Sequence, residues 1–192
     1  MLEGPNGESA IGDRYSAAVR TDREADTLRH EFAVMVKAEQ PAVVDRLDAA
    51  LSLVLKDLDM EAAQEGVLAL WMPSELERAI VTAGDPVTPP QMTGTSWSGL
   101  IYLDGELHVI ATVDVALADQ HLPAAIASAV QDTVDENTGE PRPACPIHGH
   151  PLLPEGSLSG SVWVCPKDPQ SWWCHIGTYH EAAGRDRAPR RE

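Results

Sequence analysis

The residues most able to do chemistry are concentrated near one end of the sequence. All three cysteines and four of the seven histidines fall between Cys145 and His180. Thiolate and imidazole are the side chains that zinc prefers in closed protein sites. We therefore expect the last third of the chain to fold around one bound zinc ion.

The spacing of Cys145 and His148 is typical of a zinc knuckle. The segment CPIHG begins at Cys145 and places two ligands three residues apart, so that a tight turn can aim both at one ion. Gly149 can adopt the left-handed conformation that closes such a turn. Cys165, also followed by proline, repeats the first half of the knuckle at the separation of two facing knuckles, roughly 15–20 residues. Cys145, His148 and Cys165 are thus three predicted ligands.

The fourth ligand stays open among Cys174, His150, Asp168 and His175. Ligand chemistry favours Cys174, which would face Cys165 across a short hairpin. A carboxylate such as Asp168 is uncommon in closed structural sites, and His175 should point away from Cys174 in a regular strand. His150 would reach the ion only if the turn curls back. A disulfide between Cys165 and Cys174 is the main alternative to a metal, and it requires an oxidising compartment.

Two segments, ACPIHGHPL and VWVCP, together with the later Ile176-Gly177, match a sequence pattern of other proteins. Over roughly residues 125–177 the chain resembles small uncharacterised actinobacterial proteins that end in a CPxHxHPL…WxCP zinc-ribbon-like module. That group has no assigned activity. The resemblance implies the ligand set Cys145, His148, His150 and Cys165, so it favours His150 where ligand chemistry favours Cys174.

The elements that must position this cluster begin with two helices. Apolar residues recur at helical spacing over 22–39 and, most clearly, over 41–58, and Gln40-Pro41 separates the two segments. We expect these helices to form an αα-hairpin packed on its apolar faces.

The middle of the chain predicts shorter elements. A capping box, S-x-x-E, begins at Ser74 and predicts a helix over 75–81, and a short helix is expected over 60–64. Residues 82–94 are expected to form a loop because they hold several prolines and glycines. β-Branched and aromatic residues on either side of Asp104-Gly105 predict a β-hairpin of 97–103 and 106–115. A helix is expected over 122–134.

These elements together predict an α+β protein. We expect a flexible N-terminal lead (1–21), an acidic α+β domain (22–138) containing a helical hairpin and a β-hairpin, a small zinc-ribbon-like module (144–180) and a disordered tail (181–192). The three tryptophans near Cys165 are expected to pack beside the ion, because a small metal module has little other core.

Charge and hydropathy narrow the class of partner. The net charge of −16 lies entirely in residues 1–138, while 139–192 sum to zero. An acidic body repels nucleic acid and anionic lipid, so neither is expected as a partner. No segment is apolar and long enough for a signal peptide or a membrane span, so we expect a cytoplasmic protein with reduced thiols.

No catalytic motif accompanies the cluster. The sequence lacks the phosphate-binding loop, the dinucleotide fingerprint, the nucleophile elbow, H-E-x-x-H and the zinc-deaminase signature. We therefore expect a non-catalytic, zinc-stabilised adaptor or regulatory protein that binds another protein. The alternatives are an acidic decoy that occupies a basic surface of its partner and, with less support, a zinc-dependent hydrolase. The sequence does not indicate the oligomeric state.

Overall fold

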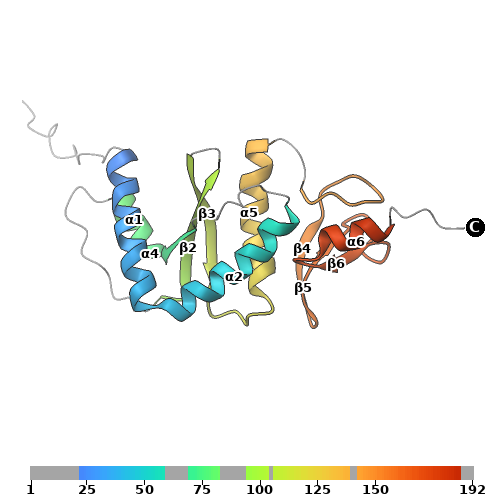
Figure 1. Ribbon diagram of the computed structural model, residues 1–192, viewed down its shortest axis with the longest axis horizontal. Helices are drawn as coiled ribbons and strands as arrows, with labels where there is room; N and C mark the ends of the chain where they lie inside the picture. Colours follow the sequence, from blue (N-terminus) through green and yellow to red (C-terminus); the bar gives the residue numbers. More distant parts are fainter. Residues whose placement is uncertain (1–21, 59–68, 83–93, 104–105, 139–141, 187–192) are drawn as a thin grey trace, which may run out of the picture.

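The computed structural model describes residues 22–58, 69–82, 94–103, 106–138 and 142–186. These residues form five helices and two separate antiparallel sheets of three strands each, which confirms the α+β class. Figure 1 shows the first sheet and its helices at one end of an elongated molecule and the second sheet at the other, with helix α5 between them.

Helices α1 (Asp22–Glu39) and α2 (Pro41–Asp57) form where the apolar spacing predicts them. They diverge instead of packing as a hairpin: α1 packs mainly against the first sheet and α4, and α2 packs mainly against α5 (Figure 1). The reason is the connection. Only Gln40 separates the helices, and an antiparallel return needs about two to five residues. The expected helical hairpin is therefore wrong in its packing, although both helices are correct.

The first sheet has the order β1-β2-β3. Strands β2 (Ser96–Leu103) and β3 (Glu106–Asp114) form the predicted hairpin, whose turn lies outside the described residues. Strand β1 (Leu70–Pro73) was not predicted from the sequence, because a fully buried strand of four residues shows no alternation. Its Trp71 lies over Gly99, where an added Cβ would clash with the indole ring.

Two further helices complete the first part of the molecule. Helix α4 (Ser74–Thr82) follows β1 directly and confirms the helix predicted from the capping box. Helix α5 (Leu122–Thr138) is slightly longer than predicted. The short helix expected over 60–64 and most of the expected loop over 82–94 lie outside the described residues.

The second sheet has the order β4-β5-β6. Strands β4 (Leu153–Ser157) and β5 (Gly160–Val164) form a hairpin, and β6 (Trp173–His175) pairs with the other edge of β5. The chain then forms helix α6 (Tyr179–Asp186). Residues 181–186 are thus helical where a disordered tail was expected, because Tyr179 and Ala183 pack inward on this helix.

One buried core runs through both sheets. It includes Leu47 and Val54 of α2, Ile126 and Val130 of α5, and Trp163 of β5. Helix α5 contacts β3 on one side and β4 and β5 on the other. The second sheet is thereby fixed against the helices, which gives the cysteine and histidine side chains a defined support.

Candidate metal site

Four side chains meet at one end of the second sheet. Cys145, His148 and His150 lie in the loop that precedes β4, and Cys165 immediately follows β5. One ligand atom from each of the four lies within 4.8 Å of all the others. The two segments are brought together by the β4–β5 pairing, in which Leu153 lies opposite Val164. Together these four residues could hold a metal ion, and we call them the Cys2His2 cluster.

The local backbone explains why His150 joins the cluster. The amide of Gly149 donates to the carbonyl of Cys145 at 2.8 Å, and the amide of Cys145 donates to the carbonyl of His150 at 2.7 Å. Gly149 has a φ of 73°, the left-handed conformation expected for the knuckle. The turn therefore curls back on itself, which is the condition under which His150 was expected to reach the ion.

The ligand atoms surround a common centre. The Nδ1 atom of His148 lies 3.6 Å from the sulfur of Cys145 and 3.3 Å from the sulfur of Cys165. The Nε2 atom of His150 lies 3.7 Å from the sulfur of Cys165. The two imidazole rings are stacked, with centroids 5.4 Å apart and planes inclined by 10°.

Neighbouring groups orient the ligands. The Nδ1 atom of His150 lies 3.1 Å from the carbonyl oxygen of Pro151, which can only accept, and Nε2 is directed toward Cys165. Metal-bound histidines typically donate their second ring nitrogen to a carbonyl in this way. The amide of Asp168 donates to the sulfur of Cys165 at 3.4 Å. Burial alone would raise the pKa of the Cys165 thiol, but this amide and the contact with His148 lower it to about 6. The thiolate that a metal requires is therefore favoured before any metal binds.

Burial separates the thiols of the cluster from solvent. Cys145 is 1% exposed and Cys165 is 0% exposed, while the two histidines are half-buried. The cysteines are not paired in a disulfide. The cluster therefore has two thiols inside the protein and two imidazoles at its rim.

The structure does not bring Cys174 into the cluster, contrary to the preference from ligand chemistry. Cys174 lies in the middle of β6, and its thiol faces the side of the sheet toward Thr178 and Asp57. Burial, together with the nearby Asp57 carboxylate, raises the pKa of this thiol to about 12. The expected hairpin between Cys165 and Cys174 does exist, but its register pairs Cys174 with Trp163.

The other two candidates for the fourth ligand are also placed elsewhere. His175 is exposed, and its ring lies edge-on to the ring of Trp173, with the ring centroids 5.6 Å apart. Asp168 contributes its backbone amide to Cys165, while its carboxylate accepts from the amide of Gln170. Among the described residues, only Cys145, His148, His150 and Cys165 group as potential ligands.

Sequence reasoning missed Asp57, the residue that joins the second sheet to the helices. Its buried carboxylate accepts hydrogen bonds from the Trp163 indole at 2.8 Å and from the amides of Gly177 and Tyr179 at 2.5 and 3.0 Å. Burial raises the pKa of the Asp57 carboxyl, and the three donors oppose that rise. No sequence signal identifies it, since an acid at a helix end normally faces solvent.

Comparison of the chain with family models, with curated proteins and with solved structures gave no match. The resemblance to the actinobacterial CPxHxHPL…WxCP module stays a prediction. Among the described residues, no helix is both long enough and apolar enough to cross a membrane. The fold and the Cys2His2 cluster define an α+β protein with a candidate metal site, and its function must be argued from that site.

Proposed function

We propose that the chain is a non-catalytic protein whose C-terminal module, residues 144–180, is a zinc-ribbon-like unit held by one zinc ion. Cys145, His148, His150 and Cys165 are the proposed ligands. The module in turn presents a surface that binds another protein. The observation that carries this proposal is the convergence of two cysteines and two histidines on one point.

The distances within the cluster support zinc. Zn–S bonds of about 2.3 Å and Zn–N bonds of about 2.0–2.1 Å in a tetrahedron place sulfur and nitrogen about 3.6 Å apart. Three of the four sulfur–nitrogen distances in the cluster are 3.6, 3.3 and 3.7 Å. A tetrahedral ion thus fits between these atoms with only small movements. The mixed thiolate and imidazole donor set also excludes magnesium and calcium, which prefer oxygen ligands.

The burial of the thiols supports a structural ion. Four protein ligands complete the coordination of zinc, whereas a catalytic zinc keeps one position for water or substrate. Both cysteines are inaccessible, and no described acidic side chain groups with the cluster to serve as a base. A zinc-dependent hydrolase would need both an open position and such a base.

Exposed apolar side chains support a role in protein binding. Seven large hydrophobic side chains are exposed among the described residues, and four of them belong to the module: Ile147, Leu153, Leu158 and Trp173. Leu158 stands fully exposed at the turn between β4 and β5. These exposed apolar side chains are the groups of the module that a protein partner would cover.

The compartment follows from the thiols. A zinc site with two thiolates requires reducing conditions, so we place the protein in the cytoplasm as part of this proposal. The cluster therefore accounts for the reduced cysteines without a disulfide.

Cobalt substitution tests the proposal directly. Replacing the bound ion by Co²⁺ should give the intense visible absorption of a tetrahedral site with two thiolates, and added azide or cyanide should leave that spectrum unchanged. A weak five- or six-coordinate spectrum, or a spectrum shifted by these anions, would show an open position and favour the hydrolase. Failure to bind Co²⁺ or Zn²⁺ would remove the proposal altogether.

A further inference from the structure

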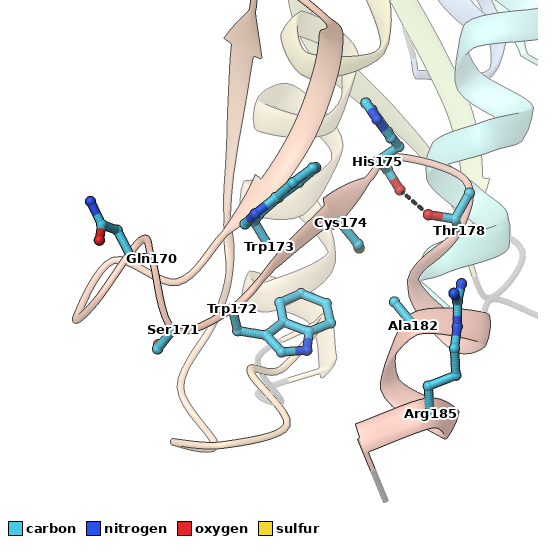
Figure 2. A pocket seen from close by; sticks show the side chains of 9 residues that line it. All are labelled: Gln170, Ser171, Trp172, Trp173, Cys174, His175, Thr178, Ala182 and Arg185. Carbon is cyan, nitrogen blue, oxygen red and sulfur yellow. Dashed lines mark hydrogen bonds between the residues drawn. The ribbon is translucent and has the colours of Figure 1, made fainter.

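A pocket of about 400 Å³ lies beside the metal-binding part of the module, between β6 and α6. Figure 2 shows Trp172, the residue before β6, projecting toward α6, with Ala182 and Arg185 on the helix that faces it. The thiol of Cys174 also lies on this side of β6 (Figure 2). The pocket is separate from the Cys2His2 cluster, since none of the four cluster residues lines it.

The pocket follows the edge of a strand. All three residues of β6, Trp173–His175, line it, together with the three residues that precede the strand. Side chains alternate between the two faces of a strand, so a pocket over one face would be lined by every second residue. Lining by consecutive residues means that the pocket runs along the strand's edge. Strand β6 is the edge of its sheet, with β5 on its other side.

The backbone of β6 presents hydrogen-bonding groups to this edge. The amide of Cys165 donates to the carbonyl of Trp172, and the amide of Ile176 donates to the carbonyl of Ser161. In an antiparallel ladder such bonded residues alternate with residues whose N–H and C=O groups point the other way. The backbone groups of Trp173 and the N–H of His175 therefore point away from β5. The carbonyl of His175 already accepts from Thr178.

The charge of the lining is opposite to that of the chain. The chain carries a net charge of −16, yet no acidic residue lines the pocket and Arg185 is its one permanent charge. The Nε of Arg185 donates to the carbonyl of Glu181 at 3.2 Å, and the Glu181 carboxylate pairs with Lys56 instead. Among the described residues, no acid forms a salt bridge with the Arg185 guanidinium. The guanidinium is thus available for a carboxylate from outside.

We infer that this pocket binds an extended peptide segment of a partner protein, which adds a strand to β6 and places an Asp or Glu side chain against Arg185. Main-chain hydrogen bonds to Trp173 and His175 would provide the pairing, and the guanidinium would select the acid. The inference deepens the proposed protein-binding role and rests on it, since the module must be folded for β6 and α6 to face each other.

A displayed library of random seven-residue segments tests this inference on the full zinc-loaded chain. We expect enriched segments to hold β-branched residues around one fixed Asp or Glu. A synthetic peptide of the enriched sequence should then shield Trp173 from acrylamide quenching. Trp173 is 55% exposed, while the other four tryptophans are at most 4% exposed, so the change reports this site.

Two further experiments test the acidic residue of the peptide and its strand pairing separately. One changes Arg185 of the protein, and the other changes the peptide backbone. Arg185→Gln should weaken binding of the acidic peptide by about tenfold or more, and should not weaken binding of the same peptide with Gln in place of its acid. The matched control is Arg78→Gln, an exposed arginine on α4, which should change nothing. N-methylation of alternate peptide residues should abolish binding in one register and leave it unchanged in the other.

Each contrary result overturns the inference. Absence of enrichment, or binding that ignores Arg185→Gln, removes the acidic-peptide site. Binding that tolerates N-methylation in both registers removes the added strand. Zinc content measured on the same sample distinguishes the two proposals. If the chain binds one zinc ion and no peptide is enriched, the peptide site is wrong and the structural zinc site stands. If the chain binds no zinc, the proposed zinc site itself is wrong.

Discussion

The two ends of the molecule bury different kinds of side chain. Around the first sheet, the fully buried side chains are mostly large aliphatic groups, such as Leu76, Ile80 and Leu100. Around the second sheet, the fully buried positions are Trp163, Leu152 and the two cysteines of the candidate metal site. A small unit buries too little apolar surface to offset its chain entropy, so it needs an additional link. If the proposed zinc site is correct, the first sheet depends on its apolar core, and the second depends on its metal ligands as well.

Hydrogen bonds as well as apolar contacts join the two regions. Besides Asp57, Gln131 of α5 donates through Nε2 to the carbonyls of Arg142 and Leu152, both at 2.9 Å. Ser161 of β5 donates to the carbonyl of Gln120 at 2.7 Å and accepts from the amide of Ala124 at 3.0 Å. These bonds fix the orientation of the second sheet, because each buried group has its partner only in one arrangement.

The largest expected effect is the loss of the metal. Cys165→Ser should abolish metal binding and with it a free energy on the order of 10 kcal/mol that structural zinc contributes. Hydrogen exchange should then show β4, β5 and β6 losing protection, while α2 and β2 keep most of theirs. Cys174→Ala is the matched control and should retain one ion. Equal protection of the second sheet in Cys165→Ser and wild type would contradict the comparison.

A substitution in the apolar core around the first sheet tests the other side of the comparison. Leu100 is 0% exposed on β2, so Leu100→Ala should lower the free energy of unfolding by about 2–5 kcal/mol through lost burial and the cavity left behind. Chemical denaturation measures the change. The metal content of the folded chain should stay at one ion. A loss of metal without a loss of stability would reverse the roles assigned to the two regions.

Asp57→Ala tests the connection between the regions. The substitution leaves the Trp163 indole and the amides of Gly177 and Tyr179 without their acceptor, which should cost about 1–3 kcal/mol. Protection of α6 should fall more than that of β2. Asp119→Ala, which removes an exposed ion pair with Arg46, is the control and should cost under about 1 kcal/mol. Equal costs for the two variants would mean that Asp57 does not join the regions.

The smallest expected effect is on the alkylation rate of a cysteine thiol. In the zinc-loaded chain, in which the second sheet stays folded, Cys174 should alkylate slowly at pH 8 although it is not a proposed ligand. The pKa of Cys174 is about 12, so roughly one molecule in 10⁴ is a thiolate at pH 8. Raising the pH to 9 should increase the Cys174 rate about tenfold, because the thiolate fraction rises tenfold at a pH far below the pKa. Peptide mapping after timed labelling of the zinc-loaded chain gives this rate, and a fast label on Cys174 at pH 8 would refute the assignment.

Local elements could be predicted from the sequence more fully than their packing. Apolar periodicity and the capping box placed α1, α2 and α4 within a residue or two, because these signals lie in neighbouring residues. Strand β1 and the divergence of α1 from α2 depend on distant contacts that no local pattern encodes.

Prediction of the candidate metal site from the sequence was limited in the same way. Cys145, His148 and Cys165 were predicted from knuckle spacing, which is a local signal. The choice between His150 and Cys174 depended on how the turn at Gly149 closes and on the register of β6 against β5. Ligand chemistry alone favoured the cysteine, and the backbone favours the histidine.

Native mass spectrometry of the chain purified without a histidine tag tests the central claim most directly. We predict one zinc ion in wild type and in Cys174→Ala, and its loss or sharply weaker retention in His150→Ala. Wild-type protein without zinc, or zinc that is retained by His150→Ala and lost by Cys174→Ala, would contradict the account.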